Sequence, residues 1–349
     1  MVVSVSGFGW SGSGAVLDFL KEYSDLEVAF NNCNVDPEFI LLSDVDGIRD
    51  LEYHLIERNS RISSYVAIQR FLKLASSYNK FMNVDRVFKG KFMEITQSYI
   101  NKLVDFEFEG ATYHEYFQTK PIFIIYNKYM PRILGNRISR IFFGDLYKKV
   151  FYEKTTKMAV SYKPDCFLQA TRDYLDSLFS MLRHNKNIPI VFDQMLPPDN
   201  PMFYMKYFEE PKCIAVRRDP RDTYLLAKCA YNSRIPIPTN NVDDFILFYR
   251  KIIQDTKMES NQYVLNVQFE DMIYKYNETK FSIEQFLGIS NHTKPKSFFK
   301  PDVSVNNTQL YRRYKGNEKD VLKIEKELSD SLYPFELFNA DINTNSIVF

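Results

Sequence analysis

Residues 2–14 read VVSVSGFGWSGSG. The β-branched run at residues 2–5 is typical of a buried parallel strand. Small residues from Gly7 to Gly14 follow directly, and an apolar helical pattern begins at Ala15. Glycines let the backbone turn tightly and approach a ligand, and the unpaired amides at a helix start favour a phosphate or sulfate group. Strand, loop and helix in this order therefore predict an anion-binding loop.

The loop satisfies two nucleotide-binding motifs only in part. Gly7-x-Gly9-x-x-Gly12 fits the dinucleotide fingerprint. That fingerprint also requires an acidic residue at the tip of the second strand, about 20 positions further on. The second strand, expected at residues 28–30, runs instead into two asparagines at 31–32. A P-loop would require Gly-Lys followed by Ser or Thr, and the loop has no lysine.

Strand and helix patterns alternate through the second half of the chain. This alternation predicts a three-layer α/β fold, with a parallel sheet flanked by helices and ligands bound beyond the carboxyl ends of the strands. We expect residues 1–349 to form one domain that carries a helical, basic insertion at residues 61–160. The expected strands are residues 188–192, 213–216 and 263–267, and the expected helices are 174–184, 222–231 and 242–257.

Charge is concentrated in the insertion. Between Lys120 and Met158 there are nine Lys or Arg and two Asp or Glu. One interpretation is a solvated, partly helical cap over the acceptor site. The other is a site for an anionic acceptor or for peripheral contact with a membrane surface. The whole chain has 45 basic and 44 acidic residues, so no global field indicates a nucleic-acid partner.

A second motif, RRDPRD at residues 217–222, follows the strand expected at 213–216. Pro220 suits the first turn of a helix and Asp222 suits its positive end. Arginine is well suited to forked recognition of phosphate. A capped helix with surface charges is the alternative interpretation. Together with the loop, the motif indicates an anionic ligand with two separated acidic groups.

These motifs resemble the sulfotransferase family, whose donor is 3′-phosphoadenosine 5′-phosphosulfate. Residues 10–13 (WSGS) align with the loop of the family, and residues 218–222 match its 3′-phosphate element. Residues 267–272, 286–289 and 312–316 are similar to its later segments. The resemblance covers residues 1–60 and 186–330, and it implies a P-loop-like sulfotransferase fold.

The resemblance also implies site residues and an acceptor hydroxyl, first of a glycan or lipid-linked glycan and second of a sterol or phenol. It implies Glu38 as the catalytic base. Asp193 is the competitor, because it lies at the carboxyl end of an expected strand, which should also face the ligand crevice. Three positions depart from the family: Trp10 replaces a basic residue, Leu226 replaces a serine, and residues 193–197 lack a histidine. The donor-binding residues that it implies are Gly9, Trp10, Ser11, Gly12, Ser13, Gly14, Arg218, Arg313, Lys315 and Gly316.

Two other functions remain open: a Rossmann-type NAD- or FAD-dependent oxidoreductase, and a non-catalytic nucleotide-binding protein. We expect no metal, because no His, Cys or Asp cluster has ligand spacing. The four cysteines form no C-x-x-C pair, the start carries no leader-like pattern, and no apolar run reaches the ~20 residues of a membrane span. These features predict a cytoplasmic protein.

Overall fold

The computed structural model describes residues 1–30, 38–60, 63–110, 141, 156–230, 237–257, 259–338 and 342. Contacts divide the chain into two compact units. The first unit comprises Met1–Asp44, Met82–Gly90 and Leu175–Phe349, and the second comprises Val45–Phe81 and Lys91–Tyr174. Most of the basic stretch at residues 120–158 lies outside the described residues.

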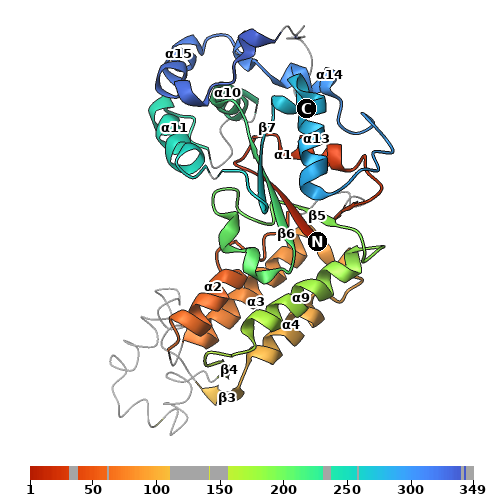
Figure 1. Ribbon diagram of the computed structural model, residues 1–349. Helices are drawn as coiled ribbons and strands as arrows, with labels where there is room; N and C mark the ends of the chain where they lie inside the picture. The colour runs from red at the N-terminus through yellow and green to blue at the C-terminus, as the bar shows by residue number, and fades with distance from the viewer. Residues whose placement is uncertain are drawn as a thin grey trace. The chain divides into compact units, whose positions relative to one another are not determined.

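The first unit is built on a wholly parallel five-stranded sheet with the strand order β2-β5-β1-β6-β7 (Figure 1). Because β1 lies at the centre of the sheet, every one of its residues is buried, and its β-branched sequence suits this environment. The expected α/β fold with a parallel sheet is confirmed. The strands are β1 (Val2–Gly7), β2 (Glu27–Val28), β5 (Ile190–Asp193), β6 (Pro211–Arg217) and β7 (Val264–Gln268).

Both faces of this sheet are covered. On one face, Val3 and Val5 of β1 share a buried cluster with side chains of α1 (Ser13–Leu20) and α13 (Tyr276–Leu287). On the other face, Phe192 of β5 contacts Phe179 of α9 (Phe167–Leu182), with 4.4 Å between ring centroids. Because side chains alternate along a strand, a strand buried on both faces has few polar positions. A ligand can therefore reach the ends of the strands but not the faces of the sheet.

The helix after β6 begins where the sequence predicts. Pro220 occupies its first position, and the carboxylate of Asp219 accepts a hydrogen bond from the Arg221 backbone N–H at 2.8 Å. This arrangement is the usual N-cap of a helix. This helix is α10 (Pro220–Leu225). The first unit also contains α11 (Val242–Phe248), α12 (Asp271–Tyr274), α14 (Pro301–Ser304) and α15 (Glu318–Glu327).

The second unit combines helices with a two-stranded hairpin. Its helical core includes Tyr99 and Tyr174, whose rings stack at 4.6 Å and whose hydroxyls bond to threonines. The helical interpretation of residues 61–160 misses the antiparallel pair β3 (Phe106–Gly110) and β4 (Thr156–Val160). The helices are α2 (Ile48–Glu52), α3 (Ser63–Met82) and α4 (Phe92–Leu103), followed by the first part of α9.

Across the described ranges, no helix has both the length and the apolar character that a bilayer crossing requires. Within the same residues, no group of three or more His, Cys, Asp or Glu side chains is arranged to hold a metal ion.

Candidate functional site

The loop between β1 and α1 has an unusual backbone. Gly9, Trp10 and Gly12 all have positive φ angles, of 81°, 54° and 90°. Such angles are easily adopted by glycine and rarely by other residues. A Cβ atom at position 12 would lie 2.4 Å from Cδ2 of Phe269, which is closer than atoms can pack. Position 12 therefore requires glycine for both its backbone angle and its space.

Side-chain hydrogen bonds hold the loop in shape. The buried hydroxyl of Ser11 accepts a bond from the Phe8 N–H at 3.1 Å. Gln194, the residue after β5, accepts a bond from the Gly7 N–H at 3.1 Å and donates one to Oγ of Ser13 at 3.2 Å. One amide side chain thus braces both ends of the loop. Our sequence reasoning missed Gln194, because nothing in the sequence places the end of β5 beside β1.

The two candidate bases adjoin each other beside this loop. The backbone N–H of Phe39 donates a hydrogen bond to the carbonyl of Asp193 at 3.2 Å, so the segment that contains Glu38 runs beside the end of β5. Asp193 also pairs in register with Val5 of β1. Glu38 is exposed and Asp193 is half-buried. The backbone thus places both residues near the loop, and their catalytic role stays a prediction.

Arg218 connects the loop to a segment far along the chain. Its side chain is only 1% exposed. Nη1 donates a hydrogen bond to the Trp10 carbonyl at 3.1 Å, and Nη2 donates one to the Asn307 carbonyl. The guanidinium also lies 4.9 Å from the centroid of the Phe269 ring, within the range of a cation–π interaction. The predicted 3′-phosphate contact would thus have to use Nε of this arginine.

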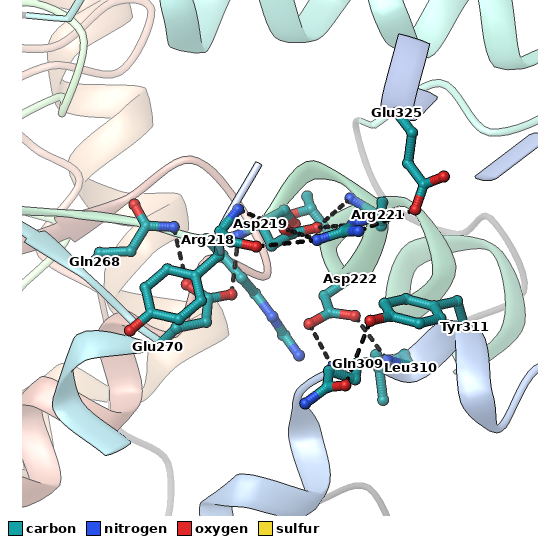
Figure 2. A network of polar contacts seen from close by, with 12 residues as sticks. Arg218, Asp219, Arg221, Asp222, Gln268, Glu270, Gln309, Leu310, Tyr311 and Glu325 are labelled. Carbon is teal, nitrogen blue, oxygen red and sulfur yellow. Dashed lines mark hydrogen bonds and ion pairs between the residues drawn. The ribbon is translucent and has the colours of Figure 1, made fainter. Parts of the chain in front are cut away.

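A buried ion pair next to Arg218 accounts for two more charges of the RRDPRD motif (Figure 2). The carboxylate of Asp219 accepts bonds from Nε and Nη2 of Arg221, at 3.0 and 2.8 Å, and from the Tyr333 N–H at 2.8 Å. Arg221 also pairs with Glu325 at 2.9 Å. Arg221 is therefore paired with two carboxylates and offers little to a ligand.

Two further carboxyl groups lie in the same network. Asp222 accepts the backbone N–H groups of Gln309 and Leu310, at 2.8 and 2.7 Å (Figure 2). Glu270 accepts the Asp219 N–H at 2.9 Å. Burial, reinforced by the negative charge of Asp219, raises the pKa of both carboxyls above the ordinary range, to about 8 for Glu270.

The late basic segment, residues 312–316, follows shortly after Gln309 and Leu310, which bond to Asp222. Arg313 is half-buried, whereas Lys315 and Gly316 are exposed. Gly316 has a φ of 87°, and its N–H donates to Glu318 at 3.0 Å. The structure thus brings together the loop, the RRDPRD motif and residues 307–310, which precede the late segment. It adds Gln194 and Phe269, which the sequence did not single out.

Comparison with known proteins gives a remote structural likeness and no match in sequence. No protein-family model and no curated protein matches it. Among solved structures it is similar to one described as "Sulfotransferase Domain from the Synechococcus PCC 7002 Olefin Synthase". The match covers 98% of this chain and 84% of the other, at 13% sequence identity and a TM-score of 0.36. A likeness this remote assigns no activity, so any functional argument rests on the site itself.

Proposed function

We propose that the chain is a sulfotransferase that takes its sulfuryl group from 3′-phosphoadenosine 5′-phosphosulfate. One observation carries the proposal: Arg218 bonds to the carbonyls of both Trp10 and Asn307. Arg218 of the RRDPRD motif thereby links the loop after β1 to a residue shortly before the late basic segment at 312–316. The proposed donor has two separated acidic groups, the 5′-phosphosulfate and the 3′-phosphate. In this proposal the loop binds one of them and the basic segments bind the other.

The residues divide into two roles in this proposal. The loop residues Ser11, Gly12, Ser13 and Gly14 hold the phosphosulfate with backbone amides and hydroxyls, with Gly9 and Trp10 shaping the turn. The 3′-phosphate is held by the late basic segment together with Arg218. The residues proposed for that second role are Arg218, Arg313, Lys315 and Gly316.

The proposed transfer needs a proton acceptor. The oxygen of an acceptor hydroxyl forms a bond to sulfur, while the bond from sulfur to the 5′-phosphate oxygen breaks and leaves its electron pair on the phosphate. The hydroxyl proton passes to the carboxylate of Glu38 or Asp193. The products are a sulfate ester and 3′-phosphoadenosine 5′-phosphate. We propose a glycan or lipid-linked glycan as the first acceptor class and a sterol or phenol as the second.

The strand order bears on the oxidoreductase alternative. In the Rossmann order, the second strand of the sheet pairs with the first. Here β5 lies between β1 and β2, so β2 has no contact with β1 in the sheet. The ribose-binding carboxylate of a dinucleotide site would come from the tip of the second strand. This topology supports a phosphosulfate donor over a dinucleotide.

Binding calorimetry tests the donor. We expect 3′-phosphoadenosine 5′-phosphate to bind clearly more tightly than 5′-AMP, because only the former carries the 3′-phosphate. Equal affinities would refute the 3′-phosphate site. A transfer assay with labelled donor against pooled glycans, sterols and phenols then separates an enzyme from a non-catalytic binding protein.

A further inference from the structure

The RRDPRD motif contains three arginines. Arg217, the last residue of β6, is the one that takes no part in the polar network around Asp219. It follows Val216, which pairs with Gly7 at the start of the loop. Its side chain is only 8% exposed. The guanidinium carbon lies 4.9 Å from the centroid of the Phe8 ring, so the charge packs against a side chain of the loop.

The hydrogen bonds of this guanidinium are incomplete. Nη1 donates to the carbonyl of Ile253, in the helical turn Tyr249–Gln254. Nε and Nη2 are buried and have no hydrogen-bond partner among the described residues. The N–H groups of Nε and Nη2 point the same way along one edge of the planar group. That edge matches two oxygens of a phosphate or sulfate group.

The two neighbouring arginines show no such open edge. Both Nη atoms of Arg218 bond to backbone carbonyls, and Nε and Nη2 of Arg221 bond to Asp219. No carboxylate of the described residues forms an ion pair with Arg217. Buried polar groups in native proteins are almost always satisfied, and a buried charge without a partner is strongly unfavourable. An anion from outside the chain would remove that penalty.

The loop has no positively charged side chain of its own for binding an anion. Residues 7–14 include no lysine or arginine, so the loop offers an anion only amides and hydroxyls. We propose that Arg217 binds a tetrahedral oxyanion, a phosphate or sulfate group, through Nε and Nη2. This inference rests on the proposed function for the identity of the ligand, a phosphate or sulfuryl group of the nucleotide donor. The anion-binding edge itself follows from the geometry of Arg217.

The test compares Arg217→Met with the wild-type chain by calorimetry, using 3′-phosphoadenosine 5′-phosphate, inorganic sulfate and adenosine as ligands. We expect Arg217→Met to weaken nucleotide binding by about 10- to 100-fold, because two charge-assisted hydrogen bonds are lost. Adenosine, which has no phosphate, should bind both proteins equally. Arg250→Met is the matched control: Arg250 lies in the same helical turn as Ile253 and pairs with Glu327, so its variant should bind the nucleotide normally.

Thermal unfolding without ligand gives an independent readout. Replacing an uncompensated buried charge with a methionine should leave the melting temperature unchanged or raise it. A marked loss of stability in Arg217→Met would indicate a structural arginine and overturn the proposal. Should that variant fail to fold, Arg217→Lys keeps the charge but loses the two-nitrogen edge, and wild-type affinity in this variant would overturn it as well.

The ligands separate this inference from the proposed function. Nucleotide binding that Arg217→Met leaves unchanged would refute the role of Arg217 and leave the sulfotransferase proposal intact. The wild-type chain could instead bind inorganic sulfate but not the nucleotide. If Arg217→Met then loses sulfate binding, the result would refute the proposed donor and support the anion site. If the wild-type chain binds neither ligand, both proposals are wrong.

Discussion

The two strands that flank β1 end in opposite kinds of chemistry. On one side, β5 ends at Asp193, which is half-buried and lies beside the exposed Glu38. On the other side, β6 ends at Arg217 and Arg218 follows it, and both are almost wholly buried. The loop after β1 thus has two carboxylate residues on one side and two buried arginines on the other. A reaction that binds an anion and removes a proton needs both, at a single strand end.

The largest expected effect tests the β5 flank. Glu38→Gln keeps the size and hydrogen bonding of the side chain but cannot accept the proton. If Glu38 is the base, steady-state turnover should fall by about 10²- to 10⁴-fold while donor affinity stays the same. Asp193→Asn should then have the smaller effect.

The opposite ranking would transfer the role to Asp193. Near-normal turnover in both variants would refute the contrast drawn between the ends of β5 and β6, because neither Glu38 nor Asp193 would then act as the base.

The next prediction tests the charge balance of the β6 flank. The pKa of Glu270 is raised from its ordinary 4.5 to about 8 in the folded protein, so folding takes up a proton at intermediate pH. Its contribution to stability is therefore fully present below about pH 4.5 and declines as the pH rises towards 8. The decline can reach at most about 1.4 kcal/mol per pH unit for one proton.

Urea unfolding of wild type and Glu270→Gln across this pH range measures the effect. The glutamine variant cannot take up the proton, so its stability should fall less steeply with pH than that of the wild type. Glu278→Gln, at an exposed position of α13, should follow the wild-type curve. Parallel curves for wild type and Glu270→Gln would show that Glu270 stays ionised in the fold.

The smallest effect concerns the loop that joins the two flanks. Gly12→Ala introduces a side chain at a φ of 90° and against Phe269, so we expect a loss of about 1–3 kcal/mol in unfolding free energy. Gly14→Ala is the control, because it lies in α1 with open space around it and should gain up to about 1 kcal/mol. Equal effects in chemical denaturation would mean that the loop adapts to a side chain at position 12.

Much of the fold was predictable because its signals are local. The β-branched run of β1 and the apolar runs of β5, β6 and β7 identify the central strands, and Pro220 marks the start of α10. The hairpin of the second unit was missed, although residues 106–109 alternate phenylalanine and glutamate, which is the two-residue period of a strand. The order of strands in the sheet was beyond prediction, because it depends on contacts between distant segments.

The candidate site was predictable only in its backbone elements. Glycines at positions 9 and 12 indicate positive φ angles from their chemistry alone. Which arginine carries an open edge does not follow from the RRDPRD motif, because it depends on distant partners. Asp219 lies beside Arg221 in sequence and pairs with it, but Asn307 and Ile253 determine the hydrogen bonds of Arg218 and Arg217.

The central position of β1 has a consequence for how the chain acquires its fold. Val2 pairs with Ile190 on one side and with Pro211 on the other, and both follow far along the chain. During synthesis β1 emerges long before either partner, so both of its edges remain unpaired, and unpaired apolar strands are prone to aggregate. Such distant pairing also slows folding, because a long segment must be ordered before the contacts form. The loop therefore comes early in the chain and is among the last parts to form, once Gln194, Arg218 and Asn307 have reached it.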